Sequence, residues 1–233
     1  MATFYGIGVG PGDSELMTVK AVNTLKQIDI LYAPKAHNDQ PSVAEKIASP
    51  YFSEELTVKR RRFPMVKDLS EKQASWRAIA EEIVADVKSG HDVGFITLGD
   101  ASVYSTYSYL LDIIGNQIAV ETVAGISAYS QIAAATSIPL VLDDELLEII
   151  PATADMSLID KAVDINDNVV LMKVATHWSE IFELLASKKL LNQAIVIVNA
   201  SMANQQQFKV AELTKETKLP YFSTLILKKK YQF

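Results

Sequence analysis

The stretch "FYGIGVGPGD", residues 4–13, decides the fold expected for this chain. Apolar residues of strand character lead into glycines at every second position from 6 to 12, and a helical pattern follows. A strand, a glycine-rich turn and a helix in this order are typical of dinucleotide-binding folds. However, Pro11 lacks a backbone N–H and Asp13 places negative charge at the helix start, both of which disfavour a phosphate. The loop therefore suits an uncharged or cationic ligand, or it is only a tight turn that packs helix on strand.

The first half of the chain alternates short apolar runs with helical patterns. The clearest helix is expected over residues 70–89, where Trp76, Ile79, Ile83 and Val87 fall near one face and Gly90 follows. This alternation predicts an α/β architecture with largely parallel strands. The strands are expected at residues 3–9, 29–34, 56–63, 92–99 and 118–123.

The second half has shorter helices and more polar loops. A helix is expected at 126–136, and the polar segment "NQQQ" (204–207) is interpreted as a loop. Strands are expected at 145–152, 168–174, 194–200 and 221–229. We place a boundary near Gly115–Gln117, which predicts two α/β lobes, residues 1–116 and 117–233, with a ligand cleft between them.

Composition excludes several classes of function. A net charge of −6, from 22 basic and 28 acidic residues, disfavours a general nucleic-acid binder. Cysteine is absent and only three histidines are present, far apart in sequence, so we predict no disulfide, no cysteine nucleophile and no metal site. Neither a signal-peptide pattern nor an apolar run of about 18 residues is found, so we expect a cytoplasmic protein without a membrane partner.

Two further stretches place small or acidic residues at strand ends. In "FITLGDASVYSTYSYL" (95–110), Asp100 could accept hydrogen bonds from ribose hydroxyls or an amine, or could cap the next helix together with Ser102. In "TVAGISAYSQIAAATSIPL" (122–140), Gly125, Ser127 and Ala128 allow close packing, either of a ligand or of a neighbouring helix.

The segment "KRRRFPM" (59–65) is the one basic cluster of the sequence. Strand alternation places Arg60 and Arg62 on one face, and Lys59 and Arg61 on the other. Such a cluster in an acidic protein indicates either a site for a polyanionic ligand or a charged edge strand that resists aggregation.

Taken in their order along the chain, three motifs resemble the tetrapyrrole methylase family. They are "GIGVGPGDSELMTVKA", "LGDASVYST" and "AGISAYS", and the resemblance spans essentially the whole chain. Further stretches are most similar to the subgroup of precorrin-2 and cobalt-precorrin-2 C20-methyltransferases of cobalamin biosynthesis. These are "YAPK" (32–35), "RRFPM" followed by Trp76, "GDASVYSTYSYL" and "PLVLDDELLEIIPAT".

The resemblance implies two α/β lobes, a polycarboxylate tetrapyrrole substrate, a homodimer, and S-adenosylmethionine as the methyl donor, with S-adenosylhomocysteine as product. The cofactor contacts that it implies are Pro11, Leu98, Gly99, Asp100, Val103, Tyr104, Ser127, Ala128, Met172 and Ala200. It also places Gly10 beside the substrate. Because they are the main basic residues near the motif loops, Lys35, Arg60 and Arg62 are hypothesised to bind substrate carboxylates.

The chain departs from the family pattern at Ala101 and Ala124, where proline is usual, and both changes are expected to loosen a loop. The methyl group of a sulfonium is already activated, so no catalytic residue is assigned. Tyr104, Asp100 and water remain candidates for accepting the proton that leaves C20.

Three alternative functions stay open. One is a sibling methylase that acts at another ring position, on uroporphyrinogen III, on diphthine or on ribosomal RNA, the last disfavoured by the acidic balance. The second is a nucleotide-dependent oxidoreductase that uses the glycine loop. The third is a tetrapyrrole carrier without catalytic activity.

Overall fold

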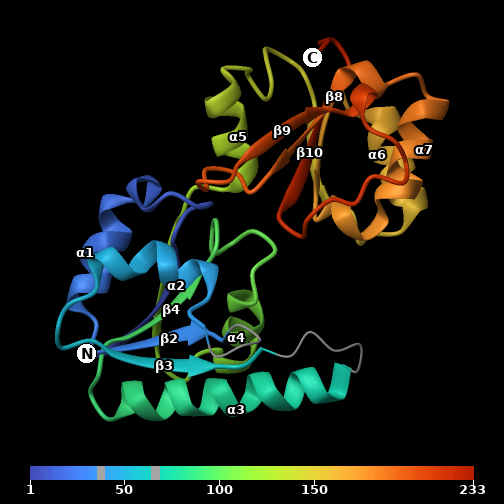
Figure 1. Cartoon of the computed structure of the whole chain (residues 1–233). Coiled ribbons are helices and arrows are strands. Elements are labelled where there is room, and N and C mark those ends of the chain that lie inside the picture. The colour runs from blue at the N-terminus through green and yellow to red at the C-terminus, as the bar shows by residue number, and fades with distance from the viewer. Residues whose placement is uncertain (36–39, 64–68) are drawn as a thin grey trace. The chain divides into compact units, whose positions relative to one another are not determined.

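The computed structural model describes residues 1–35, 40–63 and 69–233. It divides into two compact units, Met1–Ser127 and Ala128–Phe233, each with a five-stranded sheet (Figure 1). The predicted α/β class is confirmed. No helix in the described ranges is both long enough and apolar enough to cross a membrane.

The first unit contains a fully parallel sheet in the order β3-β2-β4-β1-β5. Its strands all fall within predicted runs: β1 (Thr3–Gly8), β2 (Ile30–Pro34), β3 (Thr57–Arg61), β4 (Val93–Thr97) and β5 (Ala119–Val123). The central strands β2 and β4 are almost wholly buried because helices cover both faces.

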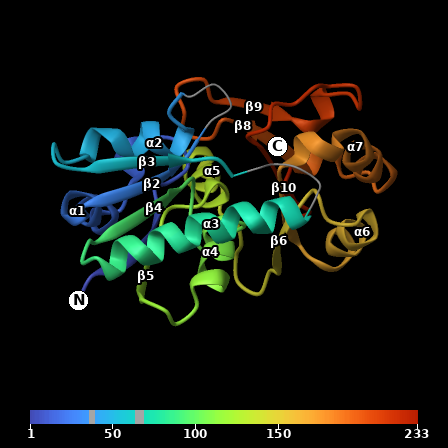
Figure 2. The same cartoon turned by 90° about the horizontal axis from the view of Figure 1, so that it is seen from below.

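Two helices pack on each face of this sheet. One face carries α1 (Val19–Gln27) and α2 (Val43–Ala48). The other carries α3 (Leu69–Lys88) and α4 (Tyr107–Ile114), which lie side by side in Figure 2. The expected apolar stripe of α3 is buried. The chain turns at Gly90, which has φ +101° and lies two residues beyond the end of the helix. Helix α3 thus confirms the predicted span of 70–89 within one residue at each end.

Strand β5 sets the division between the units. It pairs with β1 from Thr3↔Ala119 to Ile7↔Val123 and so completes the first sheet. The division therefore follows Ser127, whereas the sequence placed it at residue 116, ahead of this strand.

The second unit contains a mixed sheet in the order β6-β7-β10-β8-β9. Strand β6 (Leu147–Pro151) is parallel to β7 (Asn168–Met172), whereas β10 (Ser223–Lys228) is antiparallel to both β7 and β8 (Ala194–Val198). The expectation of largely parallel strands, which came from the first half of the chain, is confirmed in the first sheet, and the second sheet is mixed.

Strand β9 (Gln206–Lys209) pairs antiparallel with β8, and its first two residues fall in the segment 204–207 that the sequence indicated as a loop. It is an edge strand with mostly exposed, polar residues, so it lacks the apolar alternation by which strands are recognised. Helices α6 (Met156–Ile165) and α7 (Trp178–Ser187) cover one face of the sheet, and α5 (Ala128–Thr136) packs on the other. Short 3-10 turns lie at Ser14–Leu16, Ser49–Tyr51, Val174–His177, Leu191–Gln193 and Val210–Glu212.

Candidate functional site

The order of the first sheet creates a topological switch point at the carboxyl ends of β1 and β4. These strands are neighbours, but the chain leaves β1 through α1 on one face and β4 through α4 on the opposite face. Open α/β sheets bind ligands at such a switch point. The loops that follow the two strands carry the glycine-rich motif and the "LGDASVYST" motif.

Main-chain hydrogen bonds join these two loops. The Gly10 N–H donates to the Gly99 carbonyl over 3.1 Å, and the Gly99 N–H donates back to the Gly10 carbonyl over 2.8 Å. Both glycines have positive φ, +79° at Gly10 and +74° at Gly99, a conformation that side-chain-bearing residues rarely adopt. The pair fixes the two loops at one separation above the sheet.

The other glycines of the motif make room for protein atoms. A Cβ on Gly8 would lie 2.7 Å from the Gly125 nitrogen and 2.8 Å from the Gly99 oxygen, so three loops pack backbone against backbone here. A Cβ on Gly6 would lie 2.0 Å from the ring of Tyr107. The alternative in which these glycines serve close packing is therefore correct for Gly6 and Gly8.

Asp100 ties the same loops together through its side chain. Its Oδ2 accepts the Gly125 N–H over 2.8 Å, while its Oδ1 accepts the Ser102 N–H over 2.8 Å and also the Ser102 hydroxyl. The two alanines that replace the usual prolines, Ala101 and Ala124, adjoin the two ends of this tie. The carboxylate thus restrains the loops that the missing prolines were expected to loosen.

A second carboxylate occupies the helix start beyond the glycine loop. Asp13 is the N-cap of the 3-10 turn Ser14–Leu16, and its side chain accepts the Glu15 N–H over 2.9 Å. A carboxylate that caps a turn in this way takes up a backbone N–H that an anionic ligand could otherwise use. The negative charge of Asp13 next to the glycine loop disfavours a phosphate there, as the sequence indicated.

Most of the proposed cofactor residues of the first unit lie along this edge. Pro11 and Ser127 are buried, Leu98 and Val103 are partly buried, and Tyr104 is 47% exposed with φ +48°. In the second unit, Ala128, Met172 and Ala200 share one hydrophobic cluster, although they come from α5, the end of β7 and the residues after β8. The structure thus gathers the proposed residues into one group in each unit.

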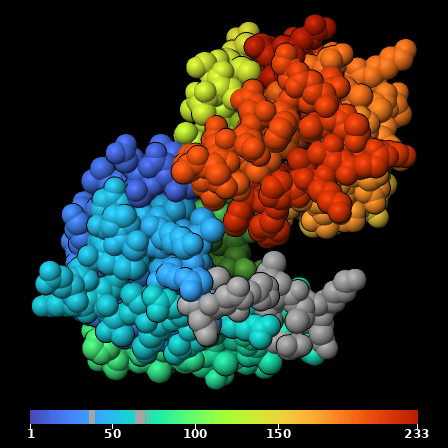
Figure 3. Space-filling model, in the orientation of Figure 1, coloured from blue at the N-terminus to red at the C-terminus, as the bar shows by residue number. Residues whose placement is uncertain are grey.

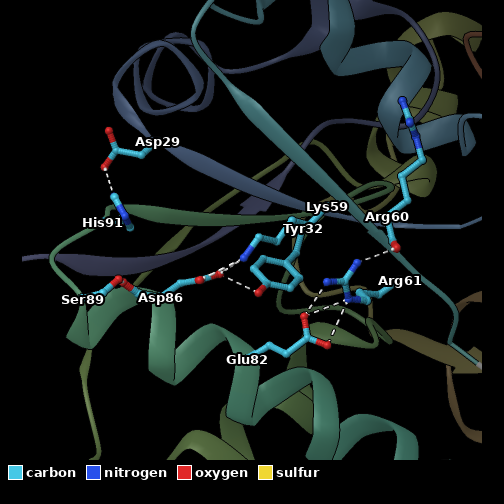
Figure 4. Close-up of polar contacts among 9 residues, drawn as sticks. All are labelled: Asp29, Tyr32, Lys59, Arg60, Arg61, Glu82, Asp86, Ser89 and His91. Carbon is cyan, nitrogen blue, oxygen red and sulfur yellow. Dashed lines mark hydrogen bonds and ion pairs between the residues drawn. The ribbon is translucent and has the colours of Figure 1, made fainter.

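The basic strand β3 is largely neutralised by the helices beside it. Lys59 Nζ lies 2.7 and 2.9 Å from the carboxylate oxygens of Asp86, and Arg61 binds Glu82 over 2.5–3.1 Å, both partners being on α3 (Figure 4). Both cations lie over the ring of Tyr32, at 5.5 and 5.7 Å from its centroid. The predicted face shared by Lys59 and Arg61 is therefore confirmed.

Tyr32 and Asp86 shift each other's proton affinity inside this cluster. The Tyr32 hydroxyl donates to Asp86 over 2.6 Å, and burial together with this carboxylate raises the pKa of Tyr32 well above its ordinary value. Burial alone would raise the pKa of Asp86, but hydrogen bonds from Lys59 and Tyr32 outweigh it and lower that pKa. The cluster is thus a neutral phenol beside an ion pair.

Arg60 points to the other side of the strand, where it meets α2. Its Nε lies 3.0 and 3.1 Å from the two oxygens of Glu45, which is only 3% exposed. Figure 3 shows the side chains of α2 (blue) packed beside those of β3 (cyan) on the first unit. This pairing commits Arg60 to Glu45 and leaves it poorly placed for a substrate carboxylate.

Lys35 and Arg62 remain at the carboxyl ends of neighbouring strands. Both residues are exposed, and the Lys35 N–H donates to the Arg61 carbonyl over 2.8 Å. Within the described ranges, no ion pair holds the Arg62 guanidinium, while its carbonyl accepts the Ser75 hydroxyl. Pro64 and Met65 of the "RRFPM" motif lie outside the described residues.

The carboxylates that pair with the basic strand were not predicted from the sequence. Glu82 and Asp86 stand four residues apart on the predicted helix, so they share a helix face, which is the one signal that could have indicated them. Nothing in the pattern around Glu45 indicates its partner. Among the described residues, no group of three or more histidine, aspartate or glutamate side chains could hold a metal ion.

Comparisons with known proteins agree on one family. The family model for tetrapyrrole (corrin/porphyrin) methylases matches residues 3–214. The cobalt-precorrin-2 C(20)-methyltransferase of Salmonella typhimurium is 37% identical over 98% of this chain and 97% of its own. The precorrin-2 C(20)-methyltransferase of Sinorhizobium is 29% identical over 95% and 93%. Uroporphyrin-III C-methyl transferase from Thermus thermophilus, solved with S-adenosyl homocysteine, has a TM-score of 0.71 at 16% identity, covering 97% and 92%.

Proposed function

Because the chain belongs to the tetrapyrrole methylase family, we propose that it transfers a methyl group from S-adenosylmethionine to C20 of cobalt-precorrin-2 in cobalamin biosynthesis. The observation that carries this proposal is the 37% identity to the Salmonella enzyme over nearly the full length of both chains. The lower identity of 29% to a relative named for precorrin-2, without cobalt in its name, favours the cobalt-containing ring as substrate.

The cofactor and the chain have separate tasks in this reaction. S-adenosylmethionine supplies an activated methyl group, which the electron-rich ring carbon can take directly. The chain must hold the two ligands in line, and the joined loops at Gly10, Gly99 and Gly125 provide a rigid edge for this purpose. Tyr104, Asp100 and water remain the candidates for the proton that leaves C20, because Oδ2 of Asp100 accepts only the Gly125 N–H among the described residues and can accept a second hydrogen bond.

We also propose which residues contact the cofactor and the substrate in this reaction. For the cofactor they are Pro11, Leu98, Gly99, Asp100, Val103, Tyr104, Ser127, Ala128, Met172 and Ala200. For the substrate they are Gly10, Lys35 and Arg62, with Arg60 left out because Glu45 binds it. The exposed Arg62 supplies a fork of donors that suits a carboxylate.

A paired anaerobic assay tests the function. The protein and S-adenosylmethionine receive precorrin-2 in one tube and cobalt-precorrin-2 in the other, mass spectrometry counts the added methyl groups, and NMR locates them. We expect one methyl group at C20, added faster to the cobalt ring. Methylation at another position, or of neither ring despite binding of S-adenosylhomocysteine, indicates a sibling methylase. Binding of NADH without S-adenosylhomocysteine indicates an oxidoreductase.

We further propose that the protein works as a homodimer in the cytoplasm, as membership of the family implies. Light scattering of the purified protein measures the oligomeric state directly. A mass near the 25.6 kDa of a single chain contradicts the dimer.

A further inference from the structure

Lys173 adopts a backbone conformation that lysine rarely takes. It directly follows β7 and has φ +62° and ψ +35°, in the left-handed region. That region is unfavourable for residues with a Cβ, and glycine would occupy it without strain. Strained residues of this kind concentrate at functional sites, where the surrounding structure holds them in place.

The position of Lys173 in the sheet is the one that ligands favour. Strands β6, β7 and β8 run in the same direction, so their carboxyl ends share one edge of the second sheet. Asn199, the residue directly after β8, also has a positive φ of +53°. Next to Lys173 stands Met172, whose partly buried side chain belongs to the cluster that also contains Ala128 and Ala200.

The charge of Lys173 has no protein partner among the described residues, although the residue is partly buried. Some lysines of the same unit bind carboxylates, as Lys188 does with Asp160 and Asp164. Others without a carboxylate partner in the described part of the chain, such as Lys161 and Lys209, are exposed to solvent, whereas Lys173 is not. A partly buried cation without a counter-charge is the expected feature of a site whose anion arrives with the ligand.

Lys189 is a second lysine with a left-handed backbone, and its conformation has a structural explanation. It has φ +58°, is exposed, and lies just beyond the end of α7, where the Leu190 N–H bonds back to the Leu185 carbonyl over 2.8 Å. A left-handed residue at such a position is a common way to end a helix. Lys173 follows a strand instead, so helix termination does not account for it.

We propose that Lys173 binds a carboxylate of a reaction ligand through its ammonium group. The proposal rests on the methyltransferase function, which supplies two sources of that anion. One is the amino-acid carboxylate of S-adenosylmethionine, and the other is a side-chain carboxylate of the tetrapyrrole.

Three variants test the proposal: Lys173→Gly, which removes both the strain and the cation; Lys173→Arg, which keeps the cation; and Lys189→Gly as the matched control. Calorimetry measures the affinity for S-adenosylhomocysteine, and an absorbance titration measures the affinity for cobalt-precorrin-2. We expect Lys173→Gly to weaken one of the two affinities about tenfold, as the loss of one charge-assisted hydrogen bond does. The weakened ligand identifies the source of the carboxylate.

The controls separate binding from stability. Lys173→Gly and Lys189→Gly should both keep or raise the melting temperature, because each removes the strain of a left-handed residue. Lys189→Gly should leave both affinities unchanged, and Lys173→Arg should retain most of the binding. The proposal is overturned if Lys173→Gly binds both ligands like the wild type, or if it melts well below Lys189→Gly. Both titrations are independent of turnover, so a wild-type protein that binds but does not methylate C20 refutes the proposed function and not the role of Lys173.

Discussion

Arg60 and Arg62 stand two positions apart, yet only Arg60 has a carboxylate partner among the described residues. The Glu45 carboxylate opposite Arg60 is almost fully buried. A buried carboxylate that loses its cation keeps the full cost of its desolvation. The two arginines should therefore respond very differently to replacement.

We expect Arg60→Ala to lower the free energy of unfolding by about 2 kcal/mol, because Glu45 is left without its hydrogen bonds. Arg62→Ala should change stability by less than about 0.5 kcal/mol, as exposed substitutions usually do, and should raise KM for the tetrapyrrole. Urea unfolding and steady-state kinetics measure the two effects. An Arg60→Ala variant of normal stability with a raised KM would show that Arg60 leaves Glu45 for the substrate.

The raised pKa of Tyr32 predicts how the stability of the folded protein changes at alkaline pH. The pKa of this side chain in the folded protein lies above the usual phenol value of about 10. Its contribution to stability is therefore fully present below pH ~10 and is lost as the pH rises further, because the unfolded chain then ionises first. Tyr32→Phe should be about 1 kcal/mol less stable at pH 7, where it lacks the hydrogen bond to Asp86.

The difference in unfolding free energy between wild type and Tyr32→Phe should narrow between pH 9 and pH 11. Urea unfolding at a series of pH values measures it. A difference that stays constant across this range would mean that the Tyr32 hydroxyl is not held neutral by Asp86.

At the scale of loops and strands, the packing of glycine on glycine determines the shape of the candidate site. Gly8→Ala would place a methyl group against the backbone of Gly99 and Gly125, which cannot move without opening all three loops. A Cβ on Gly115, in contrast, would meet no atom within 4 Å, so replacement there adds only backbone strain from its φ of +52°.

We expect Gly8→Ala to cost about 3 kcal/mol of stability through overpacking, and Gly115→Ala about 2 kcal/mol through backbone strain at its φ of +52° and ψ of −128°. Only Gly8→Ala should weaken the binding of S-adenosylhomocysteine, measured by calorimetry. Unchanged affinity in a folded Gly8→Ala protein would place the cofactor away from these loops.

The elements differ in how far the sequence could predict them. The apolar run of a buried strand such as β8, "AIVIV", predicts the strand directly. Helix α3 is predicted in the same way by its apolar stripe and by the glycine beyond its end. Strand β9 could not be recognised, because Phe208 is its one apolar residue and a single apolar residue shows no alternation. It forms through pairing with β8, which local sequence does not record.

Within the candidate site, residue types were predictable and their partners were not. The motifs indicated the loops of Gly10, Gly99 and Gly125, since glycine has few other reasons to recur there. The pairing of Arg60 with Glu45 and the left-handed backbone of Lys173 arise from tertiary packing. Neither follows from any local pattern.

Over the whole molecule, the two units have separate hydrophobic cores. Leu110 is fully buried in the core around α3 and α4, and Leu225 is fully buried in the core around α6 and α7. A core Leu→Ala substitution costs about 3 kcal/mol. Because the clusters are distinct, each substitution should weaken its own unit most.

Limited proteolysis with mass spectrometry tests this expectation. Leu225→Ala should lose residues 128–233 first while a fragment close to residues 1–127 survives, and Leu110→Ala should show the reverse. Simultaneous loss of both units in both variants would mean that they unfold as one cooperative body.

The place of β10 between β7 and β8 also determines when each unit can fold during synthesis on the ribosome. All five strands of the first sheet have been made by residue 123, so that unit can fold while translation continues. The second sheet must wait for residues 223–228, and until they emerge β7 and β8 each expose an unpaired apolar edge. A translational pause just before Ser223 would prolong the interval in which the nascent chain needs protection from aggregation.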